Sequence, residues 1–363
     1  MVEFWRAGGS VSGGSAAQVQ AQAQELEAEG WDGQMFMDSQ SLSADPFVLM
    51  GAWAVAAKNI KLCTGVTNPA TRHLAVLAAN IASVQSLSGG RAVLGIGRGD
   101  SALAYLGHAP VTLPAFRRAL VTLQTLLSGQ EAEFGTRPLF AEAASVESLA
   151  LGARPAAMRL KWLPAGLPKV PLDVAATGPK VIEMAAQIAE RVTFSVGAMK
   201  ERLAWALDLA NRAGGGRRIS FGAQIIVVCH PDIEAVRAAA TSFVAPLARF
   251  QVIQGQAAGP QSESDAANFA AIRGAYDMTK HDHVIAHDKL KGAELDWDFV
   301  RHFAIIGPPE HCIERLLELA AMGIERFVVV GPGFHPEAGQ GGRSLFATAV
   351  MPAVRARLCG RNS

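Results

Sequence analysis

The feature that most constrains the fold is an alternation of short β-branched runs with longer Ala- and Leu-rich segments of helical period, repeated along the whole chain. This alternation is typical of βαβ units and of a parallel sheet. Eight strands are expected, at residues 3–7, 33–38, 61–66, 92–97, 172–176, 192–196, 220–228 and 327–330. Eight strands with helices between them predict a (β/α)8 TIM barrel.

Helices are expected at residues 15–29, 46–58, 74–87, 114–127, 179–190, 201–213, 233–250, 309–322 and 345–357. Barrels of this kind commonly use about this length for one domain, so we expect residues 1–363 to form a single domain. An open, doubly wound sheet is the rival topology. It is disfavoured because no Gly-x-Gly-x-x-Gly follows the first strand, where a dinucleotide-binding fold would carry it.

Two long stretches interrupt the alternation, at about residues 131–168 and 255–298. Loops of this length are usually functional or disordered, so each is a candidate wall of an active site. The second stretch carries three histidines within seven positions, His281, His283 and His287. They could be acid–base groups, exposed loop residues without a role, or metal ligands; we expect no metal site, and we take His281 as a candidate catalytic residue.

Composition excludes several classes of partner. The formal net charge is +1 and the basic residues are scattered, so we expect no nucleic acid partner. No run of about 18 uncharged apolar residues and no signal peptide are found, which predicts a cytoplasmic protein without a membrane partner. The four cysteines lie far apart and form no Cys-x-x-Cys motif, so we expect reduced thiols.

A glycine-rich segment follows the fourth expected strand. It places glycines at alternate positions, Gly95, Gly97 and Gly99, and then an acid, Asp100. Glycines let a backbone approach a flat ring closely, although a strand end that only needs tight turns would look the same. This end of a barrel strand faces the active site, where Asp100 could give or take a proton.

Another segment, Thr177-Gly178-Pro179-Lys180, precedes an expected helix. The free backbone N–H groups of the first helical turn, the helix dipole and the lysine could together hold a phosphate. By itself, a Gly-Pro pair in this place is more often a simple helix cap.

Taken together, residues 62–73, 78–83, 89–100, 173–185 and 189–194 resemble the bacterial-luciferase-like superfamily in order and spacing, and its methylenetetrahydromethanopterin-reductase-like branch in particular. The resemblance extends over most of the barrel and thins in the two long stretches. It implies a flavin or deazaflavin held at the C-terminal mouth of the barrel.

The resemblance also implies roles for individual residues. Asp38 would lie beside the pyrimidine end of the ring; Ser39 stands where many deazaflavin users have histidine. Cofactor contacts are further implied for Thr64, Gly65, Val66, Gly97, Arg98, Gly99, Thr177, Gly178, Pro179, Lys180, Ser195, Val196 and Gly197, with a non-proline cis peptide between Gly65 and Val66. Substrate contacts are expected from Trp5, Asn68, Arg72 and His287, although Trp5 could equally pack in the barrel interior.

Three functions are compatible with these residues. The first is an oxidoreductase that uses coenzyme F420 to move a hydride to or from a small organic substrate. The second is a monooxygenase that takes reduced FMN from a separate flavin reductase and activates oxygen on it. The third is a non-catalytic flavin-binding barrel, against which the presence of Asp38 and Asp100 argues. In each case we expect a homodimer.

Overall fold

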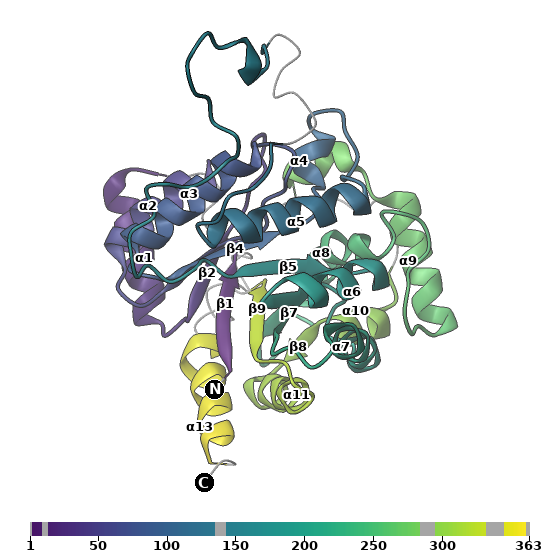
Figure 1. Ribbon diagram of the computed structural model, residues 1–363. Coiled ribbons are helices and arrows are strands. Elements are labelled where there is room, and N and C mark those ends of the chain that lie inside the picture. Colours follow the sequence, from purple (N-terminus) through teal and green to yellow (C-terminus); the bar gives the residue numbers. More distant parts are fainter. Residues whose placement is uncertain (1, 9–13, 135–142, 284–294, 332–344, 361–363) are drawn as a thin grey trace.

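The computed structural model describes residues 2–8, 14–134, 143–283, 295–331 and 345–360 (Figure 1). The strands of these residues are β1 (Glu3–Ala7), β2 (Gly33–Phe36), β3 (Lys61–Thr64), β4 (Ala92–Ile96), β5 (Leu172–Ala176), β6 (Arg191–Phe194), β7 (Ser220–Cys229), β8 (Ile305–Gly307) and β9 (Arg326–Val330).

The α-helices are α1 (Ala16–Ala28), α2 (Pro46–Ala56), α3 (Leu74–Leu87), α4 (Ser101–Ala104), α5 (Leu113–Leu127), α6 (Pro179–Ile188), α7 (Lys200–Gly214), α8 (Arg237–Ala248), α9 (Glu263–Ala275), α10 (Trp297–Phe303), α11 (Pro309–Ala321) and α13 (Met351–Cys359). Shorter helical turns are η1 (Val146–Ser148), η2 (Arg249–Gln251), η3 (Met278–His283) and the π-helical η4 (Phe346–Val350).

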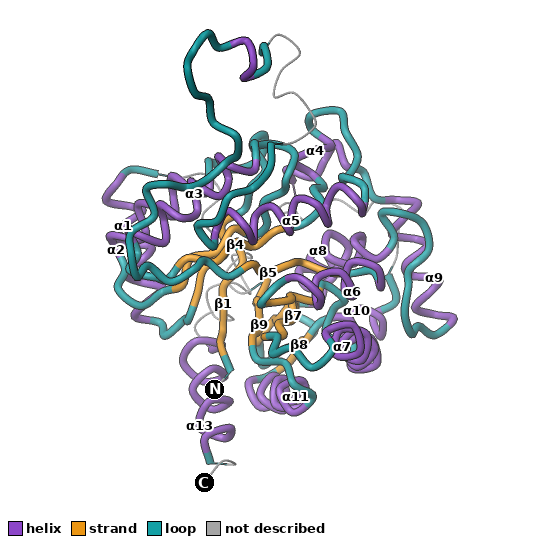
Figure 2. Tube along the Cα trace, viewed as in Figure 1, coloured by secondary structure: helices purple, strands orange, loops and turns teal. Residues whose placement is uncertain are grey.

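The strands close into a parallel barrel. Their order is β6-β5-β4-β3-β2-β1-β9-β7, and a further pairing of β6 with β7 completes the ring. Figure 2 shows the strands gathered in the middle of the molecule with helices around them. The predicted (β/α)8 barrel is therefore confirmed, and the open-sheet alternative is wrong because the first and last strands of the order pair with each other.

The ninth strand, β8, was not predicted. It pairs with the C-terminal end of β7, from Val227 to Cys229, and lies outside the ring. Three residues are too few to show an alternating pattern in the sequence. The stretch 255–298 is not a loop throughout: it contains α9 and η3, and α10 begins near its end, at Trp297.

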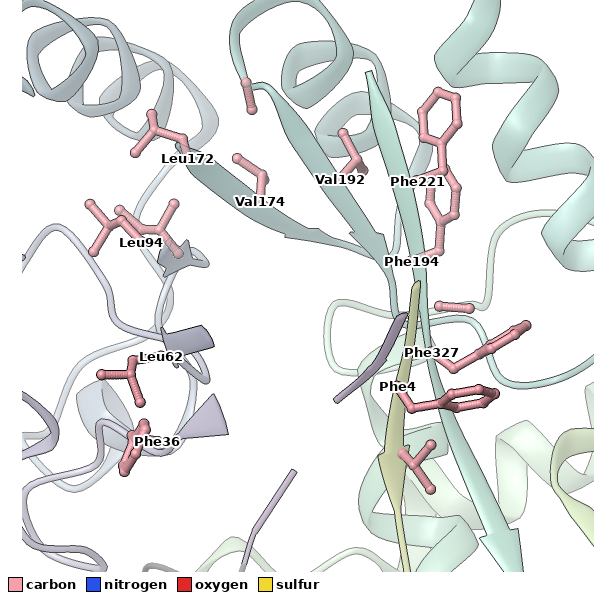
Figure 3. Packing of buried hydrophobic residues seen from close by; sticks show 14 of the residues in the cluster. Phe4, Phe36, Leu62, Leu94, Leu172, Val174, Val192, Phe194, Phe221 and Phe327 are labelled. Carbon is pink, nitrogen blue, oxygen red and sulfur yellow. The ribbon is translucent and has the colours of Figure 1, made fainter. Parts of the chain in front are cut away.

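Outward-facing side chains of the strands form the main hydrophobic core, between the barrel and its helices. Figure 3 shows Phe4, Leu62, Leu94, Leu172 and Phe327 among these side chains, and all five are fully buried. Since successive residues of a strand point to opposite sides, the residues between them face the barrel interior. The barrel interior contains buried polar and charged side chains as well as apolar ones.

The N-terminal end of the interior is closed by charged groups. Asp173 of β5 and Arg326 of β9 form an ion pair at 2.8 Å, with side chains 2% and 1% exposed. Thr193 donates to Asp173 at 2.8 Å and accepts from Arg326 at 3.0 Å. The guanidinium groups of Arg191 and Arg326 lie 4.8 and 5.6 Å from the Trp5 ring centroid, and Trp5 is fully buried. The structure thus places Trp5 in the packed interior and not in a substrate pocket.

The stretch 131–168 joins the end of α5 to the start of β5, so it leaves and rejoins the barrel at the N-terminal ends of the strands. Gln85 at the end of α3 donates to the carbonyl oxygen of Pro168 at 2.8 Å, and Ala132 pairs with Met158. Figure 1 shows the described part of this stretch projecting from the body of the molecule. We therefore assign a wall of the site only to the other long stretch.

Removing one partner of the buried pair should destabilise the protein strongly. We expect Asp173→Asn to lower the free energy of unfolding by about 3 kcal/mol, because Arg326 would remain charged and buried without its counter-charge. Asp208→Asn breaks an exposed pair with Arg212, 60% and 67% exposed, and should change stability by less than about 0.5 kcal/mol. Urea unfolding of the three proteins measures both; equal effects of the two substitutions would contradict the expectation.

Candidate functional site

The predicted site residues follow four neighbouring strands. Asp38, Gly65, Gly97 and Thr177 come directly after the C-terminal ends of β2, β3, β4 and β5, which pair in parallel in this order. The C-terminal ends of parallel strands share one end of a barrel. These four residues therefore lie at the C-terminal mouth of the barrel, the end at which the resemblance implies a cofactor.

Small inward-facing residues make room at this end. Ala7 on β1, Gly65 after β3, and Ala175 and Thr177 at β5 are all partly exposed to solvent. One layer deeper in the interior, Cys63 and Trp5 are fully buried. Burial raises the pKa of the Cys63 thiol. The interior is thus open at the C-terminal mouth and closed below it.

The backbones of β3 and β4 approach each other closely at the mouth. Thr64 donates its hydroxyl to the carbonyl oxygen of Gly95 at 2.7 Å, and Gly97 donates its N–H to the carbonyl of Thr67 at 2.9 Å. A Cβ on Gly95 would lie 2.0 Å from the carbonyl oxygen of Thr64, so only glycine fits. The peptide bond Gly65–Val66 is cis, as the resemblance implied.

Asp38 is buried and already has partners. Its Oδ2 accepts from the Thr67 hydroxyl at 2.5 Å and from Arg72 at 2.6 Å. Arg72 also donates to Asp45 at 2.7 Å and stacks over the Phe47 ring at 5.0 Å. Burial alone would lower the pKa of Arg72, but its two carboxylate partners raise it above the ordinary value. Arg72, predicted to bind substrate, is thus held by Asp38 and Asp45.

Asn68 offers an unused hydrogen-bond donor at the mouth. Its Oδ1 accepts from the N–H groups of Ala70 and Thr71, each at 3.0 Å, and this fixes the orientation of the carboxamide. Asn68 is 1% exposed, and its Nδ2 finds no partner within the described part of the chain. A buried donor without an acceptor costs about 1–3 kcal/mol. This group is suited to an acceptor on a bound ligand.

The N-terminus of α6 lies beside this mouth. Gly178 is the N-cap and has no side chain to satisfy the first N–H groups, and a Cβ placed on it would meet nothing within 4 Å. Thr177, Gly178 and Pro179 are partly exposed, and Lys180 is exposed. The first turn can therefore receive an anion from solvent.

The residues that follow β6 are packed against other parts of the protein. Ser195 is buried; its hydroxyl donates to Gln224 at 2.8 Å, and its carbonyl accepts from Gln251 at 2.5 Å. Val196 is buried, and Gly197 has φ +81° with its Cα against the Phe303 ring. In this structure Ser195, Val196 and Gly197 contact neighbouring protein groups, and their predicted phosphate contact stays a prediction.

A lid covers the strand-4 loop that carries Arg98, Gly99 and Asp100. We define the lid as residues 249–283. Arg249, which is 5% exposed, forms an ion pair with Asp100 and lies 4.3 Å from the Phe250 ring centroid and 5.0 Å from that of Tyr276. Arg98 donates to Gln254 at 3.0 Å. The described part of the stretch expected as a wall of the site thus belongs to a segment that contacts the strand-4 loop and begins before residue 255.

His281, a predicted catalytic residue, is part of this lid. Its Nδ1 is hydrogen-bonded to the Tyr276 hydroxyl. His287 lies outside the described residues. Sequence reasoning missed Arg249 and Tyr276, because neither belongs to a local motif and their partners are distant in the chain.

The base of the lid is fastened by Arg202 of α7, which is fully buried. Its guanidinium donates to the carbonyls of Pro260 and Ala258 at 2.9 and 2.8 Å and to Gln251 at 2.7 Å. Burial lowers the pKa of Arg202 to about 10. The lid is thus rigidly held where it begins.

Within the described ranges, no three or more His, Cys, Asp or Glu side chains gather in a way that could hold a metal ion. None of the helices in those ranges has the length and apolar character needed to span a bilayer.

The sequence profile of the family described as luciferase-like monooxygenase matches residues 1–326. The chain belongs to this family. It is therefore a luciferase-like oxidoreductase, and the relatives below include both reductases and monooxygenases.

Two curated relatives carry the same description. A 5,10-methylenetetrahydromethanopterin reductase from Methanolobus tindarius is 25% identical over 326 residues, which cover 85% of this chain and 89% of that protein. The one from Archaeoglobus fulgidus is 27% identical over 296 residues, which cover 77% and 79%.

Solved structures share the barrel. Coenzyme F420 dependent tetrahydromethanopterin reductase from Methanopyrus kandleri superposes with a TM-score of 0.70 at 20% identity, covering 97% of this chain and 99% of that one. EDTA monooxygenase from Chelativorans sp. superposes with a TM-score of 0.66 at 15% identity, covering 98% and 94%. At these identities the likeness shows the fold.

The ion pair between the lid and the strand-4 loop should control lid opening. We expect Asp100→Ala to raise amide hydrogen exchange in α9 and η3 about tenfold, or about 1.4 kcal/mol, because Asp100 is partly exposed and the pair is weaker than a fully buried one. Glu234→Ala, which removes an exposed pair with Arg237, is the matched control and should leave that exchange unchanged. Identical exchange in both variants would show that the pair does not hold the lid.

Proposed function

We propose that this protein uses coenzyme F420, which in its reduced form gives a hydride to a small organic substrate and in its oxidised form accepts one from it. The observation that carries the proposal is the mouth itself, where small inward-facing residues leave an opening over a closed interior and beside a helix N-terminus. Support for the deazaflavin comes from the solved structure described as coenzyme F420 dependent tetrahydromethanopterin reductase, together with the curated relatives described as 5,10-methylenetetrahydromethanopterin reductases.

Several residues fit such a cofactor. The glycine-lined approach of β3 and β4 would flank a flat ring, and the Nδ2 of Asn68 would donate to an acceptor on the ring or the substrate. The first turn of α6, with Lys180, would hold a phosphate. When bound and reduced, the cofactor supplies the hydride. Asp38, tied to Arg72, would keep a negative charge beside the ring edge.

A flavin monooxygenase is the second candidate. It is favoured by Ser39, which stands where many deazaflavin users have histidine; Ser39 is buried and its hydroxyl lies 3.2 Å from that of Ser101. Such an enzyme would receive reduced FMN from a separate flavin reductase. A non-catalytic barrel would bind either cofactor and turn over neither.

Binding of the two cofactors separates these candidates. We expect fluorescence titration to give at least tenfold tighter binding of coenzyme F420 than of FMN. Tighter binding of FMN, with oxygen consumption when reduced FMN is supplied, would overturn the deazaflavin proposal in favour of the monooxygenase. Binding of neither cofactor would refute both.

Lys180 tests the phosphate site. Lys180→Ala should weaken binding of the preferred cofactor about tenfold, because a charge-assisted hydrogen bond contributes about 1.5 kcal/mol or more. Lys58→Ala is the control, since Lys58 is an exposed lysine after α2. Equal affinities for Lys180→Ala and the unsubstituted protein would refute the phosphate role.

We also propose a homodimer formed by α2 and α3, which lie side by side (Figure 1). Neither helix contains a charged residue, and Val48, Val55 and Val76 are 71%, 75% and 50% exposed. A Cβ on Gly51 would meet nothing within 4 Å. An uncharged apolar face of this kind matches itself across a two-fold axis, and large exposed apolar patches mark interfaces.

Val55→Asp tests this face. Two carboxylates would be buried against the opposite copy, so we expect sedimentation velocity to show a dimer for the unsubstituted protein and a monomer for the variant. Leu151→Asp, at a residue 64% exposed on the other long stretch, should remain dimeric. A monomeric unsubstituted protein would end the proposal.

We also propose that the chain forms one domain and works in a reducing compartment. β1 pairs with β9, and Arg355 of α13 donates to the carbonyl of Gly30, so both halves of the chain share one barrel. Cys63, Cys229 and Cys312 are buried free thiols, which suits the cytoplasm.

A further inference from the structure

Both tyrosines of the chain lie where the lid meets the strand-4 loop. The sequence contains two tyrosines in 363 residues, Tyr105 and Tyr276. Tyr105 follows α4 and donates its hydroxyl to the carbonyl of Met278 in the lid at 3.2 Å. Tyr276 packs its ring against Arg249, and its hydroxyl is hydrogen-bonded to Nδ1 of His281.

The surroundings of Tyr276 keep its phenol protonated. Burial raises the pKa of Tyr276 to about 12, and Asp100 and Tyr105 act in the same direction, while the Arg249 cation opposes them. Tyr276 nevertheless remains partly exposed to solvent. The side chain therefore combines a retained proton, partial exposure to solvent beside the strand-4 loop, and a hydrogen-bonded imidazole.

Asp100 is less suited to deliver a proton. Its Oδ2 is occupied by the ion pair with the buried guanidinium of Arg249, so this oxygen is not free to contact a substrate. The guanidinium of Arg249 also lies over the rings of Phe250 and Tyr276, 4.3 and 5.0 Å from their centroids. The Asp100–Arg249 pair thus holds the guanidinium against the Tyr276 ring.

We propose that Tyr276, hydrogen-bonded to His281, donates the proton that accompanies hydride transfer, and that Arg249 is its positioning residue. This inference rests on the proposed function and adds a substrate class to it. A hydride transfer needs such a proton when the acceptor is a C=O or C=N group.

The substrate carbon receives the hydride from the reduced deazaflavin, the π electron pair moves to the oxygen or nitrogen, and the hydroxyl proton of Tyr276 goes to that atom. Protonated His281 then returns a proton to the phenolate through Nδ1 and is reprotonated from solvent. In the reverse direction, each transfer runs backwards.

The two tyrosines make a direct test possible without the substrate. Protein labelled with ¹³C at tyrosine Cζ should give two resonances, which Tyr105→Phe assigns. We expect the Tyr276 resonance to show an inflection between about pH 5 and 8, where imidazoles titrate, and His281→Ala should abolish it. The Tyr276 phenol should ionise near pH 12, and Asp100→Asn should lower that midpoint because a nearby negative charge is removed.

Cofactor proximity is tested on the same signals. Coenzyme F420 is added first and then reduced with dithionite at constant pH; FMN is used if it is the tighter ligand. We expect reduction to shift the Tyr276 resonance and to leave that of Tyr105 nearly in place. Circular dichroism of Tyr276→Phe and Tyr105→Phe controls for folding.

The outcomes separate the two proposals. If neither cofactor binds, the proposed function fails. If a cofactor binds but its reduction leaves Tyr276 unmoved, or if His281→Ala leaves the inflection in place, the proton-donor role is overturned while the proposed function stands.

Discussion

The ion pair between Asp173 and Arg326 is the constraint on which the rest of the site depends. It links β5 and β9 across the barrel, and both groups are almost completely buried. Buried charges require hydrogen-bonded partners, and Thr193 supplies them to both. This polar layer and Trp5 fill the N-terminal half of the interior, below the small, partly exposed residues of the C-terminal mouth.

The barrel could be predicted from the sequence because parallel strands buried on both faces read as short apolar runs. β8 could not, since three residues carry no period. α9 had a usable signal: Ser262 and Asp265 form a capping box, three positions apart, that the interpretation of this stretch as a loop passed over.

The site was predictable where function depends on backbone shape. Gly95 and Gly97 are marked by residue type, because a Cβ there would approach neighbouring atoms closely, whereas the cis peptide Gly65–Val66 was implied by the family resemblance. Side-chain pairing was not predictable. Asp38 was expected beside a ring, and the structure gives it Arg72 and Thr67 as partners. Arg249 meets Asp100 across 149 positions of sequence, which no local pattern records.

The candidate site and the lid come from separate parts of the chain, and this separation has an evolutionary consequence. The candidate site is formed by residues at the strand ends of the barrel. The lid is one continuous segment, which is held by Arg202 near its start and by Arg249 at the strand-4 loop. A segment attached at two such points can be exchanged or lengthened by recombination without altering the strand-end residues of the site. New substrate ranges can therefore arise in this lineage, or be engineered, by grafting lids that keep these two arginine anchors.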